Sequence, residues 1–360
     1  MRNFNYSNLK NRTWDNEILS YVAKIHEFKG KQELYLRQKP VELERLVEIA
    51  KVQSTESSNR IEGIVTTRSR LQQLVEDKTT PRNRDEKEIL GYRNILNLIH
   101  ENYQYIPLKS NYILQLHRDL LQYTDLSYGG KYKASPNEID AVLPNGEKRI
   151  LFKPLESYET PDAIEQICSS YQQALDHEIV DSLILIPCVI LDFLCVHPFN
   201  DGNGRMSRLL TLLLLYRNGY VIGKDYVIGK YISIEKEIAN TKEAYYQTLA
   251  QADLGWHEGT NDPEPFIKYM LGIILKCYRE FEKRLIISEK SGKKSSSYDI
   301  VKTYVNGTIG TFTKRDAMEN CPSLGSSSVE SALKKLVEDG TIIRKGLSRA
   351  SHYIRKDAIE

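Results

Sequence analysis

HPFNDGNGRMSR, residues 197–208, stands between two apolar segments, and we expect a mainly helical protein to form around it. The segment before it, residues 183–196, reads LILIPCVILDFLCV. That segment is too short to span a bilayer, which needs about 20 apolar residues, so we expect a buried helix. Residues 206–216 continue as a second helix. The polar run therefore lies where a loop meets a helix N-terminus.

The second half of this run has the composition of an anion-binding site. The Gly-Asn-Gly turn at 202–204 exposes backbone N–H groups and the positive end of a helix dipole. Glycine lets the backbone approach phosphate oxygens closely. Arg205 and Arg208 add two cations three residues apart. A phosphate cradle is the function that this pattern predicts.

The first half of the run supplies acid–base chemistry. Asp201 places a carboxylate where Mg²⁺ can bridge it to phosphates. His197 has a side chain whose pKa suits proton abstraction. The alternative is a polar loop capped by a buried histidine. We favour the functional interpretation because base, carboxylate, glycine turn and two arginines fall within twelve positions.

The run matches the signature of the Fic family, HxFx(D/E)GNGRxxR, at every defined position. The resemblance extends over roughly residues 50–270. It implies a helical-bundle core with a small β-hairpin flap, and transfer of AMP from ATP to a Ser, Thr or Tyr hydroxyl of a protein. Gly204 stands where members with a different transfer chemistry have lysine, which favours AMP transfer.

The same resemblance assigns a role to each polar residue of the run. The incoming hydroxyl would be deprotonated by His197, and Mg²⁺ would be held on the nucleotide by Asp201. An anion hole would be formed by Gly202, Asn203 and Gly204, with Arg205 on the β-phosphate and Arg208 on the γ-phosphate of ATP.

Residues 131–154 predict a β-hairpin, because an Asn-Gly dipeptide at 145–146 stands between short β-prone runs. By resemblance this hairpin is the flap that pairs with the target segment. An ordinary surface hairpin is the alternative. The family often has arginine at the position of Lys133. The residues expected nearest the nucleotide are Ile139, Asp140, Ala141 and Val142.

Tyr245 and Tyr246 resemble the aromatic pair beside adenine in the family, and Asp253 follows on the same predicted helix. A plain core role for the aromatic pair is the alternative.

Ser58, Glu62 and Gly63 match the family's inhibitory motif, (S/T)xxxE(G/N). By resemblance Glu62 would pair with Arg208 and occupy the cation meant for the γ-phosphate. The alternative is a surface glutamate before a helix-ending glycine. A second alternative is that Glu62 positions water for removal of AMP from a target.

We expect an N-terminal helical region over 1–100 with an inhibitory helix at about 50–63, a catalytic core over 101–288, and a winged helix-turn-helix over 298–360. Residues 290–297, KSGKKSSS, predict a linker. Three helices and a hairpin follow, the third helix beginning at a serine and ending at Gly340. Residues 290–360, the tail, carry thirteen Lys/Arg against eight Asp/Glu, which permits DNA binding or protein docking.

The chain has 360 residues, a net charge of +2 and five widely spaced cysteines without a CxxC pair. We expect these cysteines to be buried and reduced. The N-terminal residues lack the apolar core of a signal peptide, so we expect a cytoplasmic protein without membrane contact. The partners expected are ATP, a target protein, DNA through the tail, and a second copy in a homodimer. Alternative functions are AMP removal, transfer of another phosphate group, and a nucleotide-responsive DNA-binding regulator.

Overall fold

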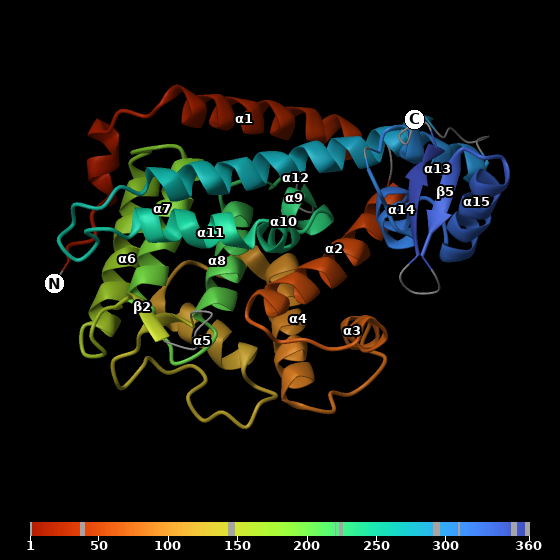
Figure 1. Ribbon diagram of the computed structural model, residues 1–360. Coiled ribbons are helices and arrows are strands. Elements are labelled where there is room, and N and C mark those ends of the chain that lie inside the picture. Colours follow the sequence, from red (N-terminus) through yellow and green to blue (C-terminus); the bar gives the residue numbers. More distant parts are fainter. Residues whose placement is uncertain are drawn as a thin grey trace.

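The computed structural model describes residues 2–36, 40–142, 148–219, 221–222, 226–290, 296–308, 310–346 and 351–356. The described part is mainly helical, as the sequence predicts, with strands only in three short antiparallel pairs. Figure 1 shows the N-terminus at one end of the molecule and the last three helices with their hairpin at the other.

The elements before residues 197–202, which we call the catalytic loop after its predicted role, are mostly helices and include the predicted β-hairpin. The helices are η1 (Tyr6–Asn11), α1 (Asn16–Leu36), α2 (Pro40–Ile61), α3 (Arg68–Val75), α4 (Arg84–Asn102), η2 (Tyr103–Tyr105), α5 (Ser110–Leu120), α6 (Thr160–Asp176) and α7 (Ser182–Val196), and the strands are β1 (Ile139–Val142) and β2 (Lys148–Phe152).

The elements after the loop include several that the sequence patterns did not single out, namely β3, β4, α9, α10 and α12. They are α8 (Asn203–Arg217), β3 (Val221–Ile222), β4 (Tyr226–Val227), α9 (Ile228–Tyr231), α10 (Ile234–Asn240), α11 (Lys242–Ala252), α12 (Glu264–Lys290), α13 (Ser297–Asn306), α14 (Lys314–Asn320), α15 (Ser326–Glu338), β5 (Ile342–Lys345) and β6 (His352–Arg355).

The two helices that flank the loop form the centre of the main core. Nearly every residue of α7 is buried, which follows from its lack of any polar face. It packs against α8, α6 and α12. One hydrophobic core runs from Phe4 to Phe281, so the helices on both sides of residue 100 pack together. Figure 1 shows α1 lying along α12 on one side of this core.

The helix α2 crosses from the C-terminal end of the molecule toward the catalytic loop (Figure 1). It packs against α4, α8 and α10. Its last turn brings residues 58–62 to the beginning of α8, which is the relationship on which the site depends.

The residues after 296 form a second hydrophobic core of their own. Helices α13, α14 and α15 are followed by the antiparallel pair β5–β6, with Ile343 opposite Ile354. This is the element order predicted for a winged helix-turn-helix, and the name itself stays a prediction. Of the predicted linker, residues 291–295 lie outside the described residues, while Lys290 ends α12 and Ser297 begins α13.

The serine predicted to cap the third of these helices does not do so. The N-cap of α15 is Gly325, and no side chain accepts a hydrogen bond there. The three consecutive serines all lie within α15, so none of them precedes the helix as its cap. Gly340, by contrast, has the left-handed φ of 77° expected of a helix-ending glycine.

Candidate active site

The loop from 197 to 202 joins α7 to α8 through two residues in left-handed conformations. His197 ends α7 with φ 48°, and Gly202 precedes α8 with φ 82°. A positive φ is uncommon for histidine and costs on the order of 1 kcal/mol or more, so the surroundings must enforce it. No side chain caps the beginning of α8. The backbone N–H groups of this first turn are therefore not used by a capping side chain, and such groups can bind an anion.

His197 is held in the neutral form that a base requires. Its Nδ1 donates to the carbonyl oxygen of Leu194 at 3.3 Å, which leaves Nε2 without a proton. Burial lowers the pKa of His197 to about 4, and the nearby ammonium of Lys133 acts in the same direction. The bond to Leu194 and the carboxylates of Glu62 and Asp201 oppose this shift only in part. At neutral pH the imidazole can accept a proton.

Asn203 fixes the loop with its side chain rather than exposing it. Its Oδ1 accepts from the backbone N–H of Phe199 at 2.9 Å, and its Nδ2 donates to the Phe199 carbonyl at 2.7 Å. The residue is buried. Its contribution to the predicted anion hole is therefore limited to its backbone.

Gly204 lies directly under a carboxylate. A Cβ at this position would overlap with Glu62 Oε1 and would lie 3.3 Å from Arg208 Nη1. Only glycine leaves room for this approach. The predicted phosphate cradle thus holds the carboxylate of Glu62 in this structure.

Arg208 forms the pair with Glu62 that the sequence predicted. Its Nη2 donates to Glu62 Oε1 at 2.7 Å and to the carbonyl of Ser58 at 3.0 Å. Its Nε donates to Ser58 Oγ at 2.8 Å. Arg208 is buried, so the pair is shielded from solvent on one side. The serine and the glutamate of the predicted inhibitory motif therefore hold the same guanidinium.

The end of α2 is built to present Glu62. The helix ends at Ile61, and Gly63 follows with φ 80°, a left-handed conformation suited to glycine. Lys242 Nζ, from α11, donates to the Ile61 carbonyl at 2.7 Å. A cation is favourable at a helix C-terminus. Lys242 had no local sequence signal, because its partner lies 181 residues away.

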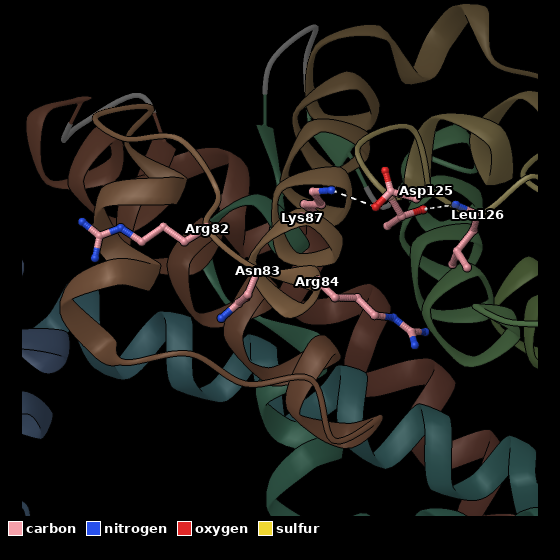
Figure 2. Close-up of a pocket in the computed structure, with 7 residues that line it drawn as sticks. Arg82, Asn83, Arg84, Lys87, Asp125 and Leu126 are labelled. Carbon is pink, nitrogen blue, oxygen red and sulfur yellow. Dashed lines mark hydrogen bonds and ion pairs between the residues drawn. The ribbon is translucent and has the colours of Figure 1, made fainter.

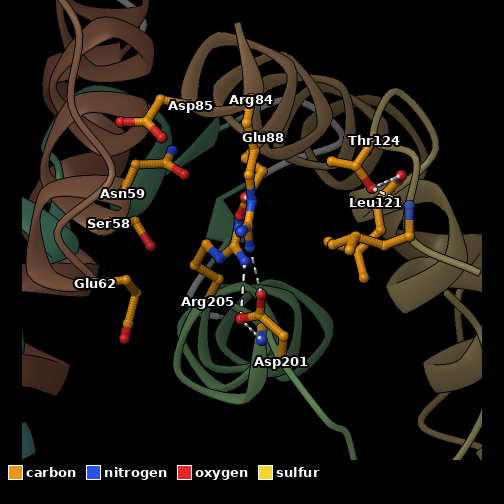
Figure 3. Close-up of polar contacts among 12 residues, drawn as sticks. Ser58, Asn59, Glu62, Arg84, Asp85, Glu88, Leu121, Thr124, Asp201 and Arg205 are labelled. Carbon is orange, nitrogen blue, oxygen red and sulfur yellow. Dashed lines mark hydrogen bonds and ion pairs between the residues drawn. The ribbon is translucent and has the colours of Figure 1, made fainter. Parts of the chain in front are cut away.

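Arg205 is buried and belongs to a network of alternating charges that reaches the surface at Arg84 (Figure 3). Its Nη1 lies 2.7 Å from Glu88 Oε2, and its Nη2 lies 3.4 Å from Asp201 Oδ1. Arg84 Nε donates to Glu88 Oε1 at 2.8 Å, and its Nη2 lies 3.6 Å from Asp201 Oδ2. Sequence reasoning did not identify Arg84 or Glu88. The contact of Arg205 with a β-phosphate stays a prediction, since its guanidinium is fully buried here.

His117 supports the loop from α5 and was also missed by the sequence analysis. Its Nδ1 accepts from the Gly130 backbone N–H at 3.1 Å, and its Nε2 donates to the Asp201 carbonyl at 3.0 Å. The ring stacks on Phe199 with centroids 3.6 Å apart. Burial lowers the pKa of His117 to about 4, so the neutral ring keeps both hydrogen bonds.

The base of the predicted flap is tied to the loop. The backbone N–H of Lys133 donates to the Pro198 carbonyl at 2.9 Å, and its Nζ donates to the Val196 carbonyl at 3.0 Å. Asn137 Nδ2 donates to the His197 carbonyl at 3.2 Å. Burial lowers the pKa of Lys133 to about 8. The flap and the catalytic loop therefore form one connected unit at this point.

The flap itself is an antiparallel pair in which Asp140 lies opposite Ile150, with an irregularity after Ile139. The predicted turn around residues 144–147 lies outside the described residues, as do the side chains of residues 140–142. Ile150 and Leu151 of β2 are exposed. The contact of residues 139–142 with a nucleotide stays a prediction.

The predicted aromatic pair divides into one core residue and one accessible residue. Tyr245 is buried and packs against Phe266, with ring centroids 6.1 Å apart. Tyr246 is 42% exposed, so only this ring can contact a ligand from solvent. Asp253 ends α11, and its burial raises its pKa to about 6. The adenine-side role of these residues stays a prediction.

A pocket of about 230 Å³ opens beside Arg84 but not on the catalytic loop (Figure 2). No residue of 197–208 lines it. Figure 2 shows that the side chains of Arg82 and Arg84 point in different directions, so they do not converge on one ligand. The lining residues are Arg82, Asn83, Arg84, Lys87, Thr124, Asp125 and Leu126.

Two absences hold for the residues that the structure describes. No three His, Cys, Asp or Glu side chains lie close enough together in these ranges to bind a metal ion as a cluster. Likewise, within the described part of the chain no helix has the length and apolar character needed to span a membrane. All five cysteines are buried and none forms a disulfide, as the sequence predicts.

Residues 107–215 match the model of the Fic/DOC family. The chain is 29% identical over 194 residues to a protein adenylyltransferase Fic from Aedes aegypti, and 26% identical over 242 residues to one from Culex quinquefasciatus. The Aedes match covers 52% of this chain and 32% of the relative, and the Culex match covers 63% and 41%. The chain thus spans about a third of the length of the first of these relatives.

Solved structures with the same fold include a Fic family protein from Desulfovibrio desulfuricans. Its TM-score is 0.59 at 19% identity, covering 96% of this chain and 97% of the other. A Fic domain containing signaling protein from Bacteroides thetaiotaomicron has a TM-score of 0.57 at 24% identity, covering 74% and 96%. At these identities the likeness is one of fold.

Proposed function

Because residues 107–215 form a domain of the Fic/DOC family, we propose that the chain is a protein adenylyltransferase held inactive by Glu62. It transfers AMP from ATP to a Ser, Thr or Tyr hydroxyl of a target protein. The observation that carries this proposal is the occupancy of one anion site. The carboxylate of Glu62 lies on the first turn of α8 and on Arg208, beside a neutral His197.

The proposed reaction needs one proton transfer and one displacement at phosphorus. His197 Nε2 takes the proton of the target hydroxyl, whose oxygen then bonds to the α-phosphorus of ATP. The bond from that phosphorus to the bridging oxygen breaks, and pyrophosphate leaves with its electron pair. The backbone N–H groups at the start of α8 and the guanidinium of Arg208 stabilise the negative charge of the phosphates.

Mg²⁺ belongs to the substrate as MgATP in this proposal, and it would neutralise phosphate charge. Asp201 fits the role of its protein ligand, because Mg²⁺ bound with phosphates needs only one or two carboxylates. The Asp201 side chain is 34% exposed, so it is accessible to an incoming nucleotide. The same carboxylate is oriented by Arg205 and Arg84.

We call the contact of Glu62 with Arg208 the brake, because it inhibits transfer in this proposal. The inhibition follows from competition between the Glu62 carboxylate and ATP for the same donors. A γ-phosphate and the Glu62 carboxylate would both use Arg208 and the space over Gly204. Displacing the carboxylate costs its charge-assisted hydrogen bond, which is worth more than a neutral one. ATP therefore binds in the braked protein without its productive phosphate arrangement.

The C-terminal unit offers mixed support for a role in DNA binding. Lys334 and Lys335 are exposed on α15, but Glu330 and Glu338 share the helix and pair with Lys314 and Lys334. This balance of charge lacks the single-sign face that phosphate binding favours. Contact with DNA, the homodimer and the cytoplasmic location remain proposals from the sequence, as does removal of AMP from the target.

The test uses purified wild type, Glu62→Gly and Glu62→Gly/His197→Ala with MgATP labelled at the α- or the γ-phosphate. We expect label on protein from the α-position alone, about tenfold or more above wild type in Glu62→Gly, which is the size of a typical coupling between sites. The label is lost when His197 is also replaced. Label from the γ-position, or none from either, contradicts AMP transfer.

A further inference from the structure

Arg205 carries its charge at an unfavourable place. It is the third residue of α8, within the first turn, where the positive end of the helix dipole repels a cation. The residue is also fully buried, which removes the water that would otherwise solvate the guanidinium. A cation in this position requires a compensating carboxylate.

Glu88 supplies that carboxylate. Its Oε2 lies 2.7 Å from Arg205 Nη1, and the exposed fractions of the two side chains are 2% and 1%. The other oxygen accepts a hydrogen bond from Arg84 at 2.8 Å, so each oxygen of Glu88 faces a guanidinium, one through this hydrogen bond and the other through the ion pair with Arg205. Glu88 belongs to α4, outside residues 107–215, and so it is contributed from beyond the family match.

Through Arg205, Glu88 reaches the catalytic loop. The second nitrogen of the Arg205 fork, Nη2, lies 3.4 Å from Asp201 Oδ1. Figure 3 shows Glu88, Arg205 and Asp201 in one line of contacts, with Glu62 off to one side. A planar guanidinium with one end fixed transmits that orientation to the group at its other end.

We propose that Glu88 is a positioning residue that acts on the catalytic loop through Arg205, which serves as a strut, a rigid link between α4 and Asp201. The inference rests on the proposed function for its catalytic consequence. If Glu88 only stores Arg205 until a phosphate arrives, removing its charge frees the guanidinium and lowers the KM for ATP. If Glu88 positions the loop, removing its charge lowers kcat.

The first role predicts a lower KM for ATP, and the second predicts a lower kcat. Measuring both constants for Glu88→Gln in the Glu62→Gly background, where the inhibitory carboxylate is absent, separates the two roles. Glu86→Gln is the matched control, because Glu86 is equally buried on α4 and pairs with Arg70 at 2.7 Å, away from the loop. We expect kcat to fall about 10- to 100-fold for Glu88→Gln, as for other small misplacements of catalytic groups. Glu86→Gln stays within about twofold, since distant sites act independently. An unchanged kcat with a lower KM overturns the proposal.

A second measurement does not depend on transfer activity. In the wild-type background, amide hydrogen exchange over residues 198–206 is expected to be about tenfold faster in Glu88→Gln than in Glu86→Gln, because the loop loses its link to α4. Equal exchange in the two variants overturns the proposal even where no AMP transfer is detected. If Glu62→Gly shows no transfer but the exchange differs, the proposed function fails and the strut stands.

If Glu88→Gln does not fold, the conservative variant Glu88→Asp tests the same proposal. Glu88→Asp keeps the charge but shortens the side chain by one methylene, so we expect a folded protein with intermediate kcat and intermediate exchange over 198–206. A fully wild-type kcat together with wild-type exchange in this variant contradicts the need for a fixed strut.

Discussion

Glu62 Oε1 lies 2.7 Å from Arg208 Nη2 and at the same time covers Gly204 at the first turn of α8. One carboxylate thus pairs with a guanidinium and lies beside a helix N-terminus, the two features that proteins use to bind phosphate. The glycine is what makes both contacts possible, because any Cβ there would displace the carboxylate. The brake and the anion site are therefore one structure, and changes to either can be tested on the other.

Gly204→Ala is expected to destabilise the protein only when Glu62 is present. The new methyl group overlaps with the carboxylate, and overpacking of this kind costs about 1–3 kcal/mol. In Glu62→Gly the overlap is absent, and alanine is favoured over glycine within a helix by about 1 kcal/mol. Urea unfolding of the four proteins in this cycle measures the coupling. The same cost in both backgrounds would mean that Glu62 does not occupy the site.

Lys242→Met is expected to weaken the brake although Lys242 has no hydrogen bond to Glu62 or Arg208 in the described contacts. The variant removes the donor to the Ile61 carbonyl, so the last turn of α2 frays and Glu62 leaves Arg208 more often. A net hydrogen bond of about 0.5–1.5 kcal/mol corresponds to about two- to tenfold more AMP transfer than wild type. Lys242→Arg keeps a cationic donor and serves as the control. Should Lys242→Met transfer no more than wild type while Glu62→Gly is active, the end of α2 does not depend on this cap.

The parts of the site that were predictable are local in sequence. Residues 197–208 carry their own turn, helix start and charges, and the Glu62–Arg208 pair follows from a second short motif. The helical fold was predictable for a similar reason, since buried helices such as α7 show in a single run of apolar residues.

The parts that were missed depend on contacts between distant helices. Glu88 and His117 both look like ordinary polar residues on amphipathic helices, yet each meets the loop about 84–117 residues later in the chain. Lys242 likewise looks like an ordinary surface lysine, and its partner, the Ile61 carbonyl, is distant in the chain. Nothing within one helix indicates which buried partner its polar side chain will meet. The serine cap of α15 failed because three consecutive serines and a glycine offer several equivalent starts.

Stability is expected to fall on acidification from pH 6.5 because of buried histidines. Burial lowers the pKa of His100 to about 3 and that of His117 to about 4, against about 6.5 in an unfolded chain. Between these values the unfolded chain binds protons that the folded protein does not, so this contribution to stability is complete above pH 6.5 and is lost toward pH 4 for His117 and toward pH 3 for His100. Each group contributes about 1.4 kcal/mol per pH unit in this window.

His117→Gln should therefore flatten the dependence of unfolding free energy on pH between 6 and 5, by the equivalent of one proton. Its absolute stability falls too, because the bonds to Gly130 and Asp201 are disturbed. The slope is the informative quantity, and urea unfolding at three pH values measures it. A slope equal to that of wild type would show that His117 takes up its proton in the folded state.

Arg315→Gln, a change within the C-terminal unit, is expected to weaken the brake and so to raise AMP transfer. Arg315 Nη2, on α14, lies 2.7 Å from Glu56 Oε2, six residues before Glu62 on the helix that presents it. Its Nε lies 2.6 Å from Glu319, whose other oxygen lies 2.7 Å from Lys236 Nζ on α10. The chain of ion pairs thus fixes α2 to both neighbours. Since partly exposed pairs are worth about 0.2–1 kcal/mol, we expect AMP transfer to rise by a factor of about 1.4 to 5.

Lys314→Gln is the matched control for this prediction. Lys314 is the neighbour of Arg315 on α14, but its partner, Glu330, lies within the C-terminal unit itself. Glu56→Gln should reproduce the effect of Arg315→Gln, and the double variant should add nothing further, because both remove the same contact. If Arg315→Gln and Lys314→Gln transfer AMP equally, the C-terminal unit does not hold α2 through this pair. If the single variants are additive, each acts through some other contact.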